Sequence, residues 1–127
     1  MLGVISANAN GVRAALKRGG FDWIKSQLDS GNAEVVCLQE VRATTDQLHE
    51  VLAAAGLSDL HVAHDSSARL GHSGVAILST KKLSKIKTGV GPKEFAETGR
   101  WVQAEIETKV SDVLKGLEDI GDINGKP

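Results

Sequence analysis

An asparagine and a glutamate each follow a short apolar segment, and together they could begin a metal site. Asn8 ends the segment 2–8, and Glu40 comes directly after the segment 34–39. A stretch with helical spacing lies between the two segments, which predicts parallel strands joined by a crossover. Both side chains would then leave the same edge of one sheet, where open α/β sheets bind ligands. Because magnesium prefers hard oxygen ligands, this amide and carboxylate are a candidate magnesium site.

The pattern along the rest of the chain predicts alternating helices and strands. Residues 21–28 have helical spacing, and 48–55 repeat it after a capping box formed by Thr44 and Gln47. Further strands are expected at 60–63, 75–79, 83–88 and 100–107. We expect the first strand to be buried and 83–88 to be an edge strand protected by lysines. Since strand–helix alternation gives way to consecutive strands, the fold class is α/β with a mixed sheet.

Length and composition limit the class of protein. The 127 residues suit one domain with a real core, and the net charge of −1 gives no global sign of nucleic-acid or anionic-membrane binding. The apolar runs are too short to cross a bilayer, and we see no secretory signal at the N-terminus. Cys37 is the only cysteine and lies in an apolar segment. An intramolecular disulfide is therefore impossible, and a cytoplasmic location is expected.

Four segments of the chain are close to the motifs of one known family of enzymes. They are 6–13 (SANANGVR), 38–40 (LQE), 71–78 (GHSGVAIL) and 98–106 (TGRWVQAEI). In this order and spacing they resemble the exodeoxyribonuclease III and apurinic/apyrimidinic endonuclease family. The resemblance implies the endonuclease/exonuclease/phosphatase fold, a layered sandwich of two sheets faced by helices. Residues 1–107 would be the N-terminal half of that fold, and 108–127 a divergent helical and polar tail.

The same resemblance implies an activity and its site. The expected reaction is magnesium-dependent hydrolysis of phosphodiesters at abasic sites and 3′ ends of duplex DNA in DNA repair, with manganese as an alternative ion. By analogy with the family, Glu40 and Asn8 are the metal-binding and catalytic residues, with Asn8 orienting groups beside the ion. Full-length members of the family are expected to act as monomers. The expected DNA contacts are Asn10, Arg13, His72 and Arg100.

Other motifs of the family have no clear counterpart here. They include a catalytic tyrosine, an Asp-x-Asn pair, a further aspartate and a terminal Asp-His, whereas this chain has no tyrosine. Asp122 and Asn124 resemble the Asp-x-Asn pair but lack the apolar strand that should precede it. No general base is therefore visible, and we expect the isolated chain to be impaired. We also expect it to self-associate through the apolar face that a second half would cover.

Two other interpretations stay open. The chain could be a non-catalytic remnant, or half of an assembly, that folds and binds without turnover. It could also be a phosphoesterase of the same superfamily that acts on small phosphoesters. Single residues have simpler roles as well, because asparagine is common in turns and charged side chains are commonly solvated.

Overall fold

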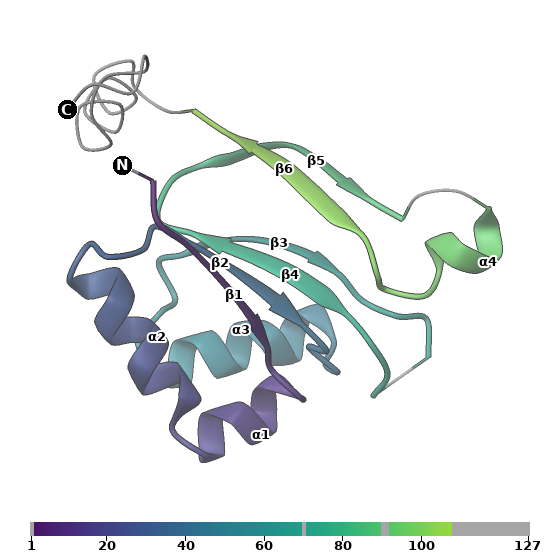
Figure 1. Cartoon of the computed structure of the whole chain (residues 1–127). Coiled ribbons are helices and arrows are strands. Elements are labelled where there is room, and N and C mark those ends of the chain that lie inside the picture. The colour runs from purple at the N-terminus through teal and green to yellow at the C-terminus, as the bar shows by residue number, and fades with distance from the viewer. Residues whose placement is uncertain (1, 70, 90–91, 108–127) are drawn as a thin grey trace, which may run out of the picture.

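The computed structural model describes residues 2–69, 71–89 and 92–107. In this part of the chain, two β-sheets and a layer of helices are stacked (Figure 1). The first sheet has the strand order β1 (Val4–Asn8), β2 (Val35–Gln39), β4 (Val75–Ser79) and β3 (His61–Asp65). The second sheet pairs β5 (Leu83–Thr88) with β6 (Val102–Ile106). The expected tail 108–127, with Asp122 and Asn124, lies outside the described residues.

The first sheet is mixed, as the sequence predicts. β1 and β2 are parallel, with Asn8 opposite Gln39, whereas β4 is antiparallel to its neighbours β2 and β3. The crossover from β1 to β2 contains α1 (Val12–Lys17) and α2 (Gly20–Asp29). Because of these directions, β1, β2 and β3 end where β4 begins. We call this side of the first sheet the carboxyl edge.

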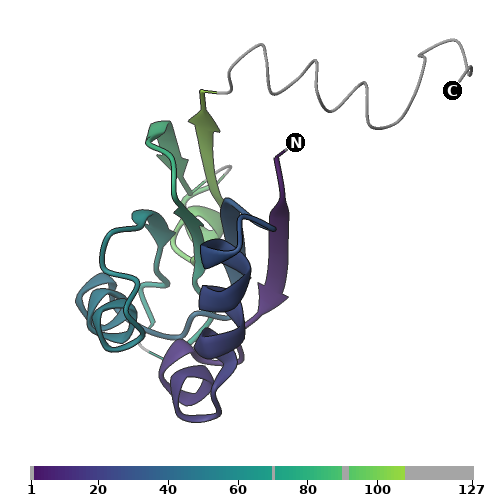
Figure 2. The same ribbon diagram turned by 90° about the vertical axis from the view of Figure 1, so that its left-hand side faces the viewer.

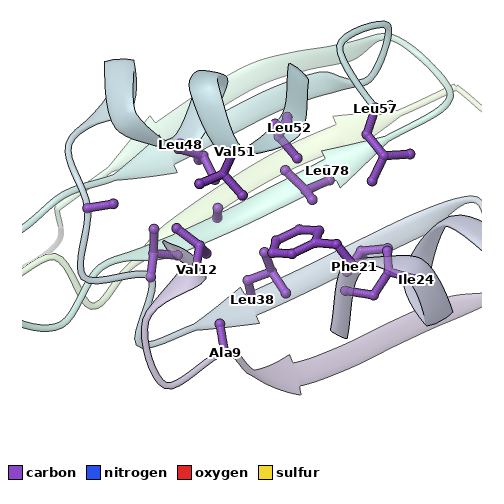
Figure 3. Close-up of a cluster of buried hydrophobic side chains, with 14 of the residues drawn as sticks. Ala9, Val12, Phe21, Ile24, Leu38, Leu48, Val51, Leu52, Leu57 and Leu78 are labelled. Atoms are coloured by element: carbon purple, nitrogen blue, oxygen red, sulfur yellow. The ribbon is translucent and has the colours of Figure 1, made fainter. Parts of the chain in front are cut away.

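The hydrophobic core lies between the first sheet and the helices α1, α2 and α3 (Thr45–Ala54), as Figure 3 shows. The largest fully buried side chains include Phe21, Leu38, Leu48, Leu52 and Leu78. The predicted capping box at the start of α3 is confirmed. Thr44 Oγ1 accepts the Gln47 N–H at 3.1 Å, and Gln47 Oε1 accepts the Thr44 N–H at 3.0 Å. None of the helices in the described ranges has the length and apolar character needed to cross a membrane.

The other face of the first sheet is covered unevenly. β5 and β6 contact β3 and β4, whereas β1 lies at the edge and, among the described strands, pairs with β2 alone (Figure 2). Exposed and partly buried side chains alternate along β1, and Val4 is 56% exposed. The expectation of a buried first strand is therefore wrong, because the helices cover only one of its two faces.

Two of the edge strands, β5 and β1, differ in their chemistry. β5 has the expected lysines, Lys85 and Lys87, and its pairing with β6 is interrupted by a register shift. Charges and bulges of this kind discourage the addition of a further strand. β1 has neither a charged residue nor a proline, and its pairing with β2 is regular. The edge at β1 is thus the unprotected one of the two.

His64 connects β3 to the start of α3 and is partly buried. Its Nδ1 lies 3.0 Å from Thr45 Oγ1, and its Nε2 is buried without a hydrogen-bond partner among the described residues. Burial lowers the pKa of His64 below its usual value of 6.5, opposed by the Asp65 carboxylate and assisted by His49. The folded protein therefore favours the neutral imidazole.

We expect the free energy of unfolding to fall as the pH drops through 6.5 toward the lower pKa of folded His64. In that range the unfolded chain binds a proton that the folded chain resists, so stability rises with pH. Urea unfolding between about pH 5 and 8 measures this effect. His64→Gln should flatten this part of the profile, and His61→Gln, at an exposed position, should not. An unaltered slope in His64→Gln would refute the assignment.

Candidate functional site

Hydrogen bonds of the main chain join the loops at the carboxyl edge. The Gly11 N–H donates to the carbonyl oxygen of Glu40 at 2.8 Å, so the turn after β1 is attached to the turn after β2. On the other side, the N–H groups of residues 41–42 donate to the carbonyl oxygens of residues 73–74 at 2.9 and 2.8 Å. The loop that contains Glu40 is therefore fixed from both sides.

Glycines allow the close approach of these segments. A Cβ on Gly74 would lie 3.3 Å from the Cβ of Val41, and one on Gly99 would lie 2.4 Å from the nitrogen of Ser67. The Gly74 N–H also donates to the carbonyl oxygen of Gly99 at 2.9 Å. The segment before β6 is thereby attached to the loop that adjoins Glu40.

Non-glycine residues with a left-handed backbone are concentrated at this edge. The φ angles are +47°, +50°, +51° and +50° for Asn10, Glu40, Arg42 and Ser73. Each such residue costs about 1–3 kcal/mol unless the surroundings impose the conformation. The main-chain hydrogen bonds described above impose it here. Strain of this kind is common in ligand-binding and catalytic loops.

Asn8 closes the turn that follows β1. Its Oδ1 accepts the N–H of Asn10 at 2.8 Å, which holds the side chain at the end of the strand. The residue paired with Asn8 is Gln39, which directly precedes Glu40. Asn8 and Glu40 therefore end neighbouring parallel strands at one edge, which is the placement that the sequence predicts.

Glu40 is paired with Arg42, which is not among the residues predicted from the sequence. Glu40 Oε2 lies 3.1 Å from Nη2 of Arg42, and the two side chains are 40% and 44% exposed. Arg13 Nη2 in turn donates to the carbonyl oxygen of Arg42 at 3.0 Å. An arginine two residues after the candidate metal ligand was the only sequence signal for this pair.

Two adjacent clefts at the carboxyl edge bring together four of the six predicted site residues that the structure describes. Glu40 and His72 line the first cleft, and Asn10 and Arg13 line the second. Arg42 lines both clefts and so lies between them. The predicted DNA contacts on α1 and on the loop before β4 are thus neighbours of Glu40.

Asn8 and Arg100 do not line these two clefts but two other pockets. Asn8 lines an apolar groove beside α2, and Arg100 lines a cavity between the two sheets together with Gln39 and Cys37. Gln39 lies on the same face of the sheet as Asn8, and its Nε2 donates to Ser6 Oγ at 3.2 Å. Gln39 was not predicted as a site residue, although the alternation of side chains along β2 was a signal in the sequence that could have placed it on this face. Burial raises the pKa of the Cys37 thiol, which disfavours the reactive thiolate.

Cationic side chains gather around these clefts. They come from α1 and its C-terminal end, from the loop after β2 and from the loop before β4, and they are Arg13, Lys17, Arg18, Arg42 and Arg69. The whole chain has a net charge of −1, so its charges are distributed unevenly. A local cationic surface attracts phosphate groups even when the net charge of the protein is near zero.

The oxygen donors at this edge suit a hard divalent cation in type. They are the carboxylate of Glu40 and the amide oxygens of Asn8 and Asn10. Within the described ranges, no three His, Cys, Asp or Glu side chains come together as a metal-binding group. Magnesium can be held by one or two carboxylates when water and substrate phosphate supply the other ligands. When bound, such an ion stabilises negative charge on a phosphate oxygen.

Comparison with known proteins shows the family and the fold. Residues 5–117 match the Endonuclease/Exonuclease/phosphatase family. An exodeoxyribonuclease of Bacillus subtilis (strain 168) is 30% identical over 104 residues, which are 82% of this chain and 38% of that protein. The recombination repair protein 1 of Drosophila melanogaster is 34% identical over 107 residues, which are 84% of this chain and 15% of that protein.

A solved AP endonuclease from Archaeoglobus fulgidus shares the fold, with a TM-score of 0.64 and 23% sequence identity. The match covers 84% of this chain and 37% of that structure. The chain therefore spans less than two fifths of the length of these relatives. The resemblance inferred from the four sequence motifs is confirmed. This chain belongs to the Endonuclease/Exonuclease/phosphatase family, and it is similar in sequence to an exodeoxyribonuclease and to the DNA repair nuclease APEX1 of Danio rerio.

Proposed function

We propose that residues 1–107 form the N-terminal half of a magnesium-dependent DNA repair nuclease that acts on abasic sites and 3′ ends of duplex DNA. The observation that supports this function is the placement of Glu40 among cationic side chains at the carboxyl edge. A carboxylate for a divalent cation and several cations for phosphates are what a phosphodiester substrate requires. The proposed location is the cytoplasm.

In this proposal different residues of the chain bind the metal ion and the DNA. Glu40 binds magnesium, for which manganese can substitute, and Asn8 orients groups beside it. Asn10, Arg13 and His72 contact the DNA backbone next to the scissile phosphate. Arg100, between the two sheets, contacts the DNA farther from Glu40. We assign no general base among these residues, so turnover by the isolated chain is expected to be slow.

A non-catalytic binding protein, or half of an assembly, is the second candidate. Its support is the short span of the chain relative to the known nucleases, together with the single carboxylate that we assign to the ion. In this case the cationic edge binds duplex DNA without cleaving it. The two candidates differ in turnover and agree on the fold.

A nicking assay on a duplex with one abasic site separates the two. With magnesium we expect slow cleavage that stops on addition of chelator and falls at least tenfold in Glu40→Ala, because the ion loses its carboxylate. Lys82→Gln, on the side of the sheet opposite the carboxyl edge, is the control and should cleave at the normal rate. Cleavage that survives Glu40→Ala would contradict the proposed site.

The other results of the same assay are also informative. Absence of turnover in a folded chain, checked by circular dichroism, would favour the binding protein. Release of phosphate from a small phosphoester without DNA cleavage would favour a phosphoesterase of the superfamily.

Binding to duplex DNA should depend on salt through the cationic edge. Each phosphate contact contributes about 0.9 to the slope of log K against log salt concentration. Arg13→Gln should therefore reduce the slope by about one and weaken binding to all sequences alike. Fluorescence anisotropy at several salt concentrations measures both effects. Lys82→Gln makes the same change of charge at the opposite side, and an equal effect there would argue against a local binding surface.

We also propose that the isolated chain self-associates through β1. Within the described part of the chain, the outer edge of β1 has no partner strand and no protecting charge. Val4 on this strand is 56% exposed, and Leu2 just before it is 37% exposed. Exposed apolar strands of this kind promote edge-to-edge pairing.

Lysine substitution at two exposed apolar positions tests this proposal. Val4→Lys should shift the chain toward the monomer in light scattering across a concentration series, because a charge on the edge opposes pairing. Ile86→Lys is the matched control, since Ile86 is 47% exposed on the lysine-containing β5. A monomeric parent chain at all concentrations, or an equal effect of both substitutions, would disprove the role of β1.

A further inference from the structure

We propose that Arg42 occupies the cation position at Glu40 and moves to a phosphate group when a divalent ion binds. Arg42 would thus couple metal binding to the binding of nucleic acid. This inference rests on the proposed function, because it concerns the same carboxylate.

The contact between Arg42 and Glu40 is of a kind that a metal ion can replace. A single distance of 3.1 Å, from Nη2 to Oε2, defines the ion pair, and the two side chains are 44% and 40% exposed. Exposed pairs of this type change an equilibrium constant by about fivefold or less. A divalent ion at the same oxygen competes directly with the guanidinium group, because both are cations.

The backbone of Arg42 is fixed, so the movement is confined to its side chain. Its N–H donates to the carbonyl oxygen of Ser73 at 2.8 Å, and its own carbonyl oxygen accepts Nη2 of Arg13 at 3.0 Å. Its φ of +51° is held by these bonds. The side-chain torsions are therefore the means by which the guanidinium group can leave Glu40.

A second position for the guanidinium group lies next to the first. Arg42 lines the cleft of Glu40 and His72, and it also lines the cleft that contains Arg13 and Lys17. The second cleft gathers positive charge, which makes it unfavourable for a displaced arginine until an anion is present. A phosphate group supplies that anion, and the planar guanidinium group can bind it through two parallel hydrogen bonds.

The two binding events should therefore assist each other. A divalent ion at Glu40 releases Arg42 for the phosphate, and a phosphate that holds Arg42 frees Glu40 for the ion. Linkage requires that each ligand raise the affinity for the other by the same factor. Simple charge screening by the ion acts on all the cationic residues, whereas this coupling depends on Arg42 alone.

Titration with Mn²⁺, followed by the electron paramagnetic resonance signal of the free ion, tests the first half of the proposal. Arg42→Gln should bind Mn²⁺ about two- to fivefold more tightly than the parent chain, because the competing cation is gone. Arg42→Lys keeps the charge and should return the affinity toward that of the parent. Arg69→Gln removes a nearby cation that does not line the Glu40 cleft, and its Mn²⁺ affinity should be unchanged.

Binding of a short fluorescent duplex with and without Mn²⁺ tests the second half. The parent chain should bind the duplex more tightly with Mn²⁺, and this increase should disappear in Arg42→Gln. Equal Mn²⁺ affinity in Arg42→Gln and the parent, or an increase that survives the substitution, would overturn the inference. Circular dichroism confirms that each variant is folded.

A Glu40→Ala titration separates this inference from the proposed function. If Mn²⁺ binds the parent and not Glu40→Ala, yet Arg42→Gln has no effect, the inference alone is wrong. If Mn²⁺ binds Glu40→Ala as well as it binds the parent, the metal role of Glu40 is wrong and the inference fails with it.

Discussion

The parallel pairing of β1 with β2 is the constraint on which the candidate site depends. It places Asn8 beside Gln39, and the hydrogen bond from Gly11 to Glu40 continues the contact beyond the strands. Since parallel strands need a crossover, α1 and α2 are required on one face, and their apolar sides complete the core there. The same pairing thus produces the core and the edge at which polar side chains meet.

Electrostatics gives that edge its chemical character. Glu40 is an anionic group in a neighbourhood of arginines, and Arg42 satisfies it by an exposed ion pair. Among the described residues, the clefts that contain the neighbouring cations on α1 and on the loop before β4 have no Asp or Glu in their lining. An arrangement of this kind is suited to ligands that bring negative charge, and a phosphodiester with its divalent ion does so. The net charge of the chain conceals this because it averages over all surfaces.

One face of the first sheet is covered only in part, and the chain spans only part of the length of its relatives. The relatives that match most of this chain extend well beyond it in length. In the described ranges β5 and β6 cover β3 and β4, whereas β1 has an open edge and an exposed Val4. β5 has lysines and a register shift, which are the usual protection of an edge, and β1 has none. β1 therefore lacks the features that discourage a further strand from adding to β5.

Local patterns in the sequence were enough to predict the strands, α2, α3 and the capping box of Thr44 and Gln47. Each of these depends on residues that are close together in the chain. The four motifs, two of which contain Asn8 and Glu40, were also enough to identify the family. α1 and α4 (Lys93–Ala96) were not predicted, because six and four residues are too few for a periodic pattern. The exposure of β1 and the pairing of Arg42 with Glu40 were decided by tertiary structure alone. The first depends on which strands become neighbours, and the second on left-handed backbone angles that non-glycine residues adopt only where contacts distant in sequence hold them.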